Sequence, residues 1–508
     1  MSKGEKQEHR DSVNLSRRKF LSTTGTAAAA FTIVPRHVLG GAGYQAPSDM
    51  VNVAGIGVGA QGGLDIQRIA DPDVPIERPQ RSSTGQPLTP EQIAEQEARR
   101  AAWAAQRAAE RERQGGQRQQ PQQEPGPRKL ANIYALCDVD TEFAAHVFEG
   151  YPRAKVYQDF RKMLDDEKEI DAVVIGTPDH THAVITAYAM RMGKHVYVEK
   201  PMCKTVHECR RLTEIAKEMN VVTQMGNQGH ATEGSRLTVE WIQSGAIGLV
   251  REVHLSTNRP IWPQGDIPRP EGVPVPGTLD WDVWLGPAPE KPYHPDICHF
   301  NWRGLWDYGT GAMGDMGAHI LDAAVWALNL GLPTKIQASS TRYNGEFMPL
   351  AEMLTYEFPA RGHMPPVKVT WVDGGLRPAR PVELEAGRGV EDAVYLGDKG
   401  AMMHRSHGAE PRIIPETAME AYEPPGPWIP RTGDIFEDFI DAIKNGRKSS
   451  NDFTVAGHLT EIMLLGNIAA LTAGENTTLE YDGVKGEFTN LPKANELLHY
   501  EYRAGWTL

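Results

Sequence analysis

Residues 50–70 combine a short apolar run, a glycine-rich turn and a helical segment. The run Met50–Gly57 is typical of a buried parallel strand that enters a turn. The turn has the pattern G-x-G-x-x-G, and the segment after it, Leu64–Ala70, has helical character. Because the N-terminus of a helix attracts phosphate, this order of elements predicts a dinucleotide site.

Each residue of this turn has an expected role. Gly57 permits the tight turn, Gly59 lets the backbone approach the pyrophosphate, and Gly62 allows the helix to pack close to the strand. Gln61 lies between them and is expected to contact the same cofactor. A turn needed only for chain reversal would show the same glycines without the strand before them.

The acidic residue that binds the adenosine ribose normally follows this turn by about twenty positions. Here the segment Asp71–Arg128, rich in Arg, Gln, Glu, Pro and Ala, displaces it and cannot form a core. With that insertion removed, Asp138 takes the ribose position at the end of the apolar run 133–137. A carboxylate there repels a 2′-phosphate and favours NAD over NADP, while the alternative role for Asp138 is a helix N-cap.

A helix is expected within the insertion. Thr89 suits the N-cap, Pro90 the first helical position, and Gln92 the partner in a capping box. The helix should run to about Gln114, where two glycines stop it. Since it has few large apolar residues, we interpret it as a projecting helix or an arm that contacts a partner.

Strand-like and helical stretches alternate after the insertion. The strand-like runs are residues 132–137, 172–176, 195–199 and 221–225. This alternation predicts a doubly wound parallel sheet with right-handed crossovers. We therefore assign residues 46–227, with the insertion 71–128, to an NAD-binding Rossmann domain.

The pattern changes beyond residue 250. Strand-like runs occur at 251–256, 335–341, 353–358 and 367–371, a hairpin turn is expected at 395–401, and helices are expected at 434–444 and 454–471. The predicted fold class is therefore α/β, with the Rossmann sheet followed by an α+β domain that has a large, mostly antiparallel sheet. This second domain, residues 228–508, would bind substrate and mediate oligomerisation.

Charge and cysteine content exclude several classes of partner. The 53 Lys and Arg residues against 66 Asp and Glu give a net charge of -13, which argues against nucleic acid or an anionic membrane surface. A small neutral substrate is favoured instead. The 4 cysteines are too few and too scattered for a disulfide framework, so they are expected to be free thiols.

The N-terminus carries a candidate export signal. Arg17 and Arg18 directly precede a mildly apolar stretch, residues 22–34, which is too short to span a membrane. This resembles a Tat signal, which we assign to residues 1–45. The Tat route carries folded proteins and would let a cofactor travel with the chain, so a periplasmic or otherwise exported location is expected.

Three motifs resemble the signatures of the Gfo/Idh/MocA oxidoreductase family, which contains glucose-fructose oxidoreductase and inositol dehydrogenase. They are Thr177–His182, Gly193–Pro201, and Gly309–His319 with Asp322 one turn further on. The resemblance covers nearly all of residues 50–508 except the insertion. It implies an oxidoreductase that moves hydride between tightly bound NAD and a secondary alcohol of a sugar, cyclitol or glycoside.

The resemblance also implies residue roles. Lys200, Asp315 and His319 become the catalytic residues, in which His319 accepts the hydroxyl proton and Lys200 stabilises the charge on the oxygen. Asp315 and His319 are four residues apart and share one face of a helix. Further residues expected to line the cofactor site are Thr177, Pro178, His182, Glu199 and Lys200 itself, with His182 mainly holding its loop.

Several polar or aromatic side chains near these motifs are candidate substrate ligands. They are His180, Asn227, His230, Arg303 and Tyr308. The loop that contains Asn227 and His230 departs from family members with Arg nearby, so the substrate stays open. The neighbouring His294, Cys298 and His299 fit no standard zinc spacing, and no metal is expected.

Two other functions stay open beside the oxidoreductase. One is an NAD-dependent glycosidase, which oxidises a hydroxyl, eliminates the leaving group, adds water and reduces the ketone again. The other is a non-catalytic sugar-binding protein, which the intact set Lys200, Asp315 and His319 argues against. By resemblance, we expect a homodimer or homotetramer that pairs through the open sheet.

Overall fold

The computed structural model describes residues 50–77, 88–95, 97–98, 101–102, 105 and 128–508. Val51–Leu508 form one compact unit. The predicted signal segment 1–45 and most of the predicted helix 89–114 lie outside the described residues.

The first sheet is parallel throughout. Its strands are β1 (Asn52–Ile56), β2 (Asn132–Cys137), β3 (Lys155–Tyr157), β4 (Ala172–Ile175), β5 (His195–Glu199) and β6 (Thr223–Gly226). Their order is β3-β2-β1-β4-β5-β6. The winding direction changes between β1 and β4, the position at which such sheets bind ligands beyond the strand ends.

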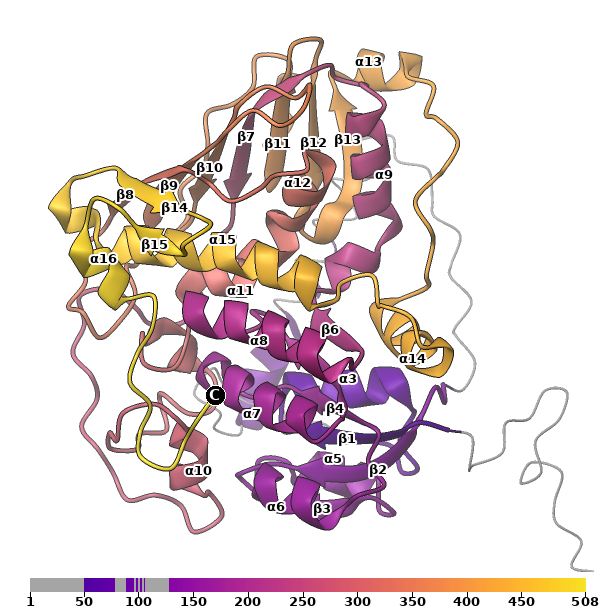
Figure 1. Cartoon of the computed structure of the whole chain (residues 1–508), viewed down its shortest axis with the longest axis vertical. Coiled ribbons are helices and arrows are strands. Elements are labelled where there is room, and N and C mark those ends of the chain that lie inside the picture. Colours follow the sequence, from indigo (N-terminus) through magenta and orange to yellow (C-terminus); the bar gives the residue numbers. More distant parts are fainter. Residues whose placement is uncertain (1–49, 78–87, 96, 99–100, 103–104, 106–127) are drawn as a thin grey trace, which may run out of the picture. The chain divides into compact units, whose positions relative to one another are not determined.

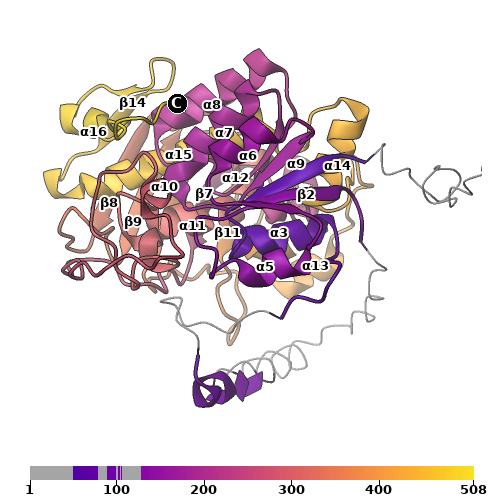
Figure 2. The ribbon, with the colours of Figure 1, turned by 90° about the horizontal axis from the view of Figure 1, so that it is seen from below.

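Helices cover both faces of this sheet (Figure 2). They are α3 (Gln61–Ile69), α5 (Ala145–Gly150), α6 (Phe160–Asp166), α7 (Asp179–Arg191) and α8 (Val206–Met219). The apolar side chains of α6, α7 and α8 belong to one buried cluster, and those of α3 and α5 belong to another. The strands are buried between the two clusters, which explains their continuous apolar runs.

The insertion leaves and re-enters the domain at adjacent points. Ala70 and Lys129 form an antiparallel bridge, and the N–H of Asp71 donates to the carbonyl of Arg128 over 2.8 Å. The predicted capping box is present, because the Thr89 N–H donates to Gln92 and the Gln92 N–H donates to Thr89 Oγ1. Since the two ends meet, the insertion lengthens a connection without disturbing the sheet.

The second sheet is large and mostly antiparallel. Its strands are β7 (Val250–Ser256), β8 (Lys335–Ser340), β9 (Glu352–Phe358), β10 (Val367–Val372), β11 (Ala393–Gly397), β12 (Ala401–Arg405), β13 (Ala409–Ile414), β14 (Leu479–Asp482) and β15 (Glu487–Phe488). Their order is β13-β12-β11-β7-β10-β9-β8-β14-β15, and β7 and β10 run parallel. The predicted fold class is therefore confirmed.

Helices α9 (Glu233–Gln243), α11 (Gly311–Ile320), α12 (Asp322–Ala327) and α15 (Phe453–Leu471) share a buried apolar cluster with the second sheet, and α15 lies between that sheet and α8 of the first domain (Figure 1). By length and hydropathy α15 could cross a membrane, but 83% of its apolar window is buried. It packs against α8, α11 and strands β8 and β9. Burial on every side explains why this helix is apolar all round.

The last part of the chain returns to the first domain. Helix α14 (Ile435–Asn445) packs on the same face of the first sheet as α3, and the ring of Phe436 stacks on Tyr197 with centroids 5.1 Å apart. The remaining short helices are α10 (Trp281–Leu285), α13 (Glu416–Ala421) and α16 (Pro492–Glu496), with 3-10 turns at Gln228–Ala231, Asn301–Gly304, Ser406–Gly408 and Ala473–Glu475.

Candidate active site

A cavity of about 690 Å³ opens beyond the carboxyl ends of the first sheet. The first domain lines it with the loop after β1, the ends of β2 and β5, and the start of α7. The second domain contributes side chains from the segment after β7, from the 3-10 turns at 301–304 and 406–408, and from α11. A ligand in this cavity would contact both domains.

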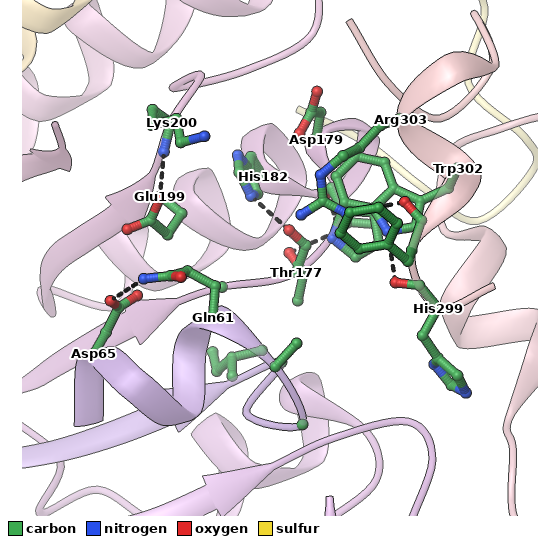
Figure 3. A pocket seen from close by; sticks show the side chains of 18 of the residues that line it. Gln61, Asp65, Thr177, Asp179, His182, Glu199, Lys200, His299, Trp302 and Arg303 are labelled. Atoms are coloured by element: carbon green, nitrogen blue, oxygen red, sulfur yellow. Dashed lines mark hydrogen bonds between the residues drawn. The ribbon is translucent and has the colours of Figure 1, made fainter. Parts of the chain in front are cut away.

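The glycine loop fits a pyrophosphate. Gly57 has a φ of 76°, which favours glycine, and a Cβ at Gly62 would collide with the Gly57 carbonyl oxygen. Helix α3 has no side-chain cap at Ala60, so its first N–H groups stay available for the phosphates. Gln61 lines the cavity and donates to Asp65 over 2.8 Å (Figure 3).

Asp138 lies at the end of β2 and faces this loop. Its carboxylate accepts the N–H of Gly59 over 2.8 Å and that of Asp140 over 3.0 Å. Burial raises the pKa of Asp138 above its ordinary value, although these backbone bonds oppose the shift. The carboxylate lines the cavity at the position from which ribose hydroxyls are bound in this fold.

An aromatic pair from both domains borders Asp138. The rings of Phe143 and His299 stack with centroids 3.9 Å apart, and His299 Nε2 lies 3.1 Å from Asp140 Oδ2. Cys298 Sγ lies 3.2 Å from the other ring nitrogen of His299. The sequence gives no signal for this stack, because the two rings are far apart along the chain.

His182 links two of the sequence motifs. Its ring nitrogens lie 2.8 Å from the carbonyl oxygen of Thr177 and 2.7 Å from that of Pro201 (Figure 3). Thr177 and Pro178 line the cavity beside it. The imidazole therefore holds the loop after β4 against the loop after β5.

A pair of buried carboxyl residues, Asp65 and Glu199, lines the cavity. Glu199 accepts the backbone N–H of Lys200 and the side chain of Gln228, both over 3.2 Å. Burial raises the pKa of Glu199, and burial beside Glu199 raises the pKa of Asp65 well above its ordinary value. The two groups can thus share a proton, and the sequence motif predicted only Glu199.

Lys200 and Asp315 meet across the two domains. Lys200 Nζ donates to the Asp315 carbonyl over 2.8 Å and to its Oδ1 over 3.0 Å. Arg259 Nε donates to Asp315 Oδ2 over 3.2 Å, and Arg303 Nε lies 3.9 Å from Oδ1. Burial opposes ionisation, yet Lys200 and Arg303 hold the pKa of Asp315 below its ordinary value.

His319 lies on α11, one turn after Asp315, and also lines the cavity. Its Nδ1 lies 3.1 Å from Asn227 Oδ1, which can only accept, so Nδ1 carries the proton and Nε2 is left as an acceptor. Burial, together with the charge of Lys200 and the nearby His407, lowers the pKa of His319 well below its ordinary value. A neutral imidazole at neutral pH can accept a proton.

Four candidate substrate ligands do not line the cavity, and the structure gives them other contacts. His180 lies buried between the carbonyls of Trp284 and Tyr308, and burial lowers its pKa to about 4. His230 is buried against the Asp322 carboxylate over 3.0 Å. These side chains satisfy buried polar groups, which is the commoner role of a core histidine.

The other two residues of that set, Tyr308 and Asn227, do not line the cavity themselves. Tyr308 is fully buried, and its hydroxyl accepts from Arg269 over 3.1 Å. Asn227 contacts His319 and orients its ring. Among the predicted substrate ligands in the described part of the chain, Arg303 alone borders the cavity.

Three further cavity residues to which the sequence assigned no role are Arg259, His407 and Trp506. Arg259 follows β7, Trp506 belongs to the C-terminal tail, and His407 stacks on His319 with centroids 3.9 Å apart. His407 has a φ of 64°, a left-handed conformation that is uncommon outside glycine. Arg259 and His407 lie in no recognised motif, and the ending 502–506, which resembles that of secreted family members, gave Trp506 no role at the cavity. Only the folded chain therefore places the three there.

Two regions of the chain match models of one oxidoreductase family. Residues 107–227 match its NAD-binding Rossmann fold, and residues 262–358 match its C-terminal alpha/beta domain. These two parts of the chain, which together make up less than half of it, are similar to the Gfo/Idh/MocA family. The matched region 107–227 includes Asp138 but not the glycine loop at 57–62, and its NAD-binding fold confirms the predicted cofactor.

Curated members of the family match part of the chain. Levoglucosan dehydrogenase of Pseudarthrobacter phenanthrenivorans is 27% identical over 37% of this chain and 40% of its own length. Inositol 2-dehydrogenase of Salmonella typhimurium is 30% identical over 25% of this chain, again 40% of its own length. The chain therefore spans about two fifths of the length of these relatives.

A solved structure shares the fold over a longer range. The NAD-binding protein from Listeria innocua has a TM-score of 0.52 and 14% sequence identity, and the match covers 85% of this chain and 97% of that one. At this identity, the likeness supports the family's fold alone.

Proposed function

We propose that the protein is an exported oxidoreductase that transfers hydride between tightly bound NAD and a secondary alcohol of a sugar, cyclitol or glycoside. The observation that carries this proposal is the meeting of Lys200, Asp315 and a neutral His319 in a cavity that also contains the glycine loop and Asp138. The names of the two curated relatives, a levoglucosan and an inositol dehydrogenase, support the substrate class.

Each catalytic side chain has one step in this reaction. Bound NAD supplies the hydride acceptor. The carbinol carbon gives up hydride while its hydroxyl proton passes to His319 Nε2, so the products are a ketone, the reduced cofactor and one proton. Lys200 uses two N–H groups on Asp315 and directs the third at the reacting oxygen, where it stabilises the developing negative charge.

Asp315 and Asn227 position these groups. Asp315 fixes the Lys200 ammonium, and Asn227 fixes the tautomer of His319 by accepting its Nδ1 proton. Asp138 binds the adenosine ribose and excludes a 2′-phosphate. Asp315 is thus a carboxylate that remains ionised beside the reacting atoms without accepting the proton itself.

The experiment is to supply sugars, cyclitols and glycosides to the protein as isolated, without added NAD. Nicotinamide fluorescence and product masses are followed together. A ketone with reduced nicotinamide supports the oxidoreductase, and release of an aglycone without net reduction assigns the glycosidase instead. An empty cofactor site, judged by the mass of the ligand freed on denaturation, together with unchanged sugars, would leave a sugar-binding protein.

Export through the Tat route is part of the proposal and rests on the twin arginine at Arg17 and Arg18. Replacing both by Lys should keep the protein in the cytoplasm, as measured by cell fractionation. Unchanged export of that variant would contradict the Tat assignment.

The proposal also includes the pairing of two copies of the chain through the second sheet. On β9 and β10, side chains of one face are buried by helices, while the opposite face carries Met353, which is 46% exposed. The half-buried Thr355 and Thr370 lie opposite each other on that open face. The solution mass should be that of a dimer or tetramer, and Met353→Arg should lower it; a wild-type monomer at micromolar concentration contradicts this pairing.

A further inference from the structure

Positive charge gathers around Asp315 at one side of the cavity. Lys200 Nζ, Arg259 Nε and Arg303 Nε lie 3.0, 3.2 and 3.9 Å from its carboxylate oxygens. Three permanent cations thus meet one ionised carboxylate, although the whole chain has a net charge of -13. The composition of the chain does not reveal this local excess.

A second acid, Asp179, also lines this part of the cavity. It is buried and accepts the hydroxyl of Thr310 over 2.5 Å. Asp179 and Glu199 face these cations at longer range. In the described part of the chain, Asp315 is nevertheless the one carboxylate that pairs with Arg259 or Arg303.

The polar atoms that Arg259 and Arg303 leave for a ligand are donors, whereas the acceptor His319 Nε2 remains for the reacting hydroxyl. In the described part of the chain, Arg259 Nη2 and Arg303 Nη2 have no acceptor, and Lys200 keeps one N–H beyond its two bonds to Asp315. Both oxygens of the Asp315 carboxylate are already engaged by these cations. The site therefore offers N–H groups without a matching set of free acceptors.

Arg303 is held in place before any ligand arrives. Its guanidinium lies 4.3 Å from the ring centroid of Trp302 and 4.6 Å from that of Phe300 (Figure 3 shows it over Trp302). Its Nη1 donates to the carbonyl of Phe300 over 3.0 Å. A guanidinium fixed in this way loses little side-chain entropy when it binds a planar anion.

Sugar hydroxyls both donate and accept, whereas a carboxylate or a sulfate only accepts. Two guanidinium groups with free N–H donors are complementary to a carboxylate or a sulfate, and the fork of each Arg matches the geometry of such an anion. We propose that the substrate is an anionic sugar, whose carboxylate or sulfate is bound by Arg259 and Arg303 while a neighbouring hydroxyl faces Lys200 and His319. This inference rests on the proposed function and replaces the neutral substrate expected from net charge.

Calorimetric binding to the NAD-loaded protein tests the inference without turnover. The probes are methyl β-D-glucuronide and methyl β-D-galacturonide, each with its methyl ester as a neutral match, and methyl glucoside 6-sulfate. Each acid should bind at least ten-fold more tightly than its ester, and tighter binding of the sulfate than of the acids would assign the anion as sulfate. Equal affinity for acid and ester without tighter sulfate binding, or no binding by any anionic probe, overturns the inference.

Variants and turnover then separate the two proposals. Arg303→Gln should reduce the ratio of acid to ester affinity about ten-fold, whereas Arg303→Lys, which keeps the charge, should retain most of it. An unchanged ratio in Arg303→Gln also counts against the inference. Oxidation of neutral sugars alone supports the oxidoreductase and refutes the anionic substrate. Tight binding of the acid without formation of a ketone or reduced nicotinamide supports the anionic ligand and contradicts the oxidoreductase.

Discussion

The protonation states of single side chains decide what the cavity can do. Burial beside positive charge keeps His319 neutral and Asp315 ionised, although both lie on one helix face. In the same cavity, burial favours the protonated forms of Asp65 and Glu199 and outweighs the opposing charge of Lys200. Desolvation thus keeps His319 neutral, so that it can act as a base, and it also favours protonation of the two acids Asp65 and Glu199.

Removing either catalytic group should affect turnover far more than cofactor binding. His319→Gln and Lys200→Met should each lower kcat by about a hundred-fold or more, the usual scale for a positioned acid or base. NAD content after purification should stay close to wild type. Asp138→Ala is the matched control, because it should weaken NAD binding and improve acceptance of NADP.

Full turnover by His319→Gln with NAD bound would remove His319 from the mechanism. His407, which stacks on it in the same cavity, would then be the next base to test.

The pH dependence should reflect the lowered pKa of His319. A base works when neutral, and burial with Lys200 nearby places its pKa well below 6.5, so kcat/KM should stay flat from neutral pH down to about 6.5 and fall only below that. Arg259→Gln removes one positive charge that lowers this pKa and should move the acid limb upward. An acid limb centred above pH 6.5 in the wild type would contradict the assignment.

At the scale of elements, the C-terminal tail closes the cofactor cavity. Tyr502 donates to Glu208 on α8 over 2.6 Å, and Arg503 donates to the Gly286 carbonyl over 3.1 Å. These contacts place Trp506 at the cavity, where Arg161 lies 4.7 Å from its ring centroid. The tail therefore connects both domains to the cofactor site.

Loss of the Trp506 ring should make NAD easier to release. Trp506→Ala should speed cofactor dissociation by about ten-fold, the effect of losing one aromatic stacking surface of about 1–3 kcal/mol. Dissociation can be followed by nicotinamide fluorescence after dilution. Trp428→Ala is the control, because Trp428 is 48% exposed and does not line the cavity. Equal release rates in the two variants would exclude a role for the tail in retention.

Strands β9 and β10 carry a second carboxyl pair. The N–H of Glu352 donates to Asp373 Oδ1 over 2.8 Å, and burial raises the pKa of Glu352 well above its ordinary value and that of Asp373 to about 7. The folded protein thus holds protons that the unfolded chain releases. The stabilisation that this carboxyl pair contributes is fully present below pH 4 and is lost as the pH rises toward 7.

Glu352→Gln keeps a donor for Asp373 but has no proton to lose. It should reduce the loss of unfolding free energy between pH 5 and 7.5 by about 1–2 kcal/mol, measured by urea denaturation. Glu357→Gln on the exposed face of the same strand should behave like the wild type. A pH dependence identical in all three proteins would contradict proton sharing by the pair.

At the scale of the molecule, the two domains share their cores. Helix α15 packs on α8, and α14 packs on α3, so the end of the chain buries apolar surface of the first domain. A single buried cluster includes residues from β4, α7, β10 and α15. Neither domain is expected to keep its structure when the other unfolds.

Calorimetry of the full chain should therefore show a single unfolding transition. Removal of NAD should lower Tm by several degrees without splitting that transition, because the ligand binds only the folded state and contacts both domains. Two separate transitions in the NAD-free protein would contradict a shared core.

The local pattern of residues was sufficient for much of the fold. The strands β2, β5, β8 and β10, the capping box at Thr89 and the glycine loop follow from apolar runs and turn chemistry, which are interactions between near neighbours. Short edge strands such as β3 and β15 were missed, because they bury little surface and carry a weak pattern.

The candidate site was also predicted only in part from the sequence. The family resemblance marked Lys200, Asp315 and His319, and the position at the end of an apolar run after the insertion marked Asp138. Only the tertiary structure brings Arg259 and His407 to the cavity and buries His180 against backbone carbonyls. Charge balance and proton affinity depend on distance and burial in three dimensions, so a chain with net negative charge can build a positively charged substrate site.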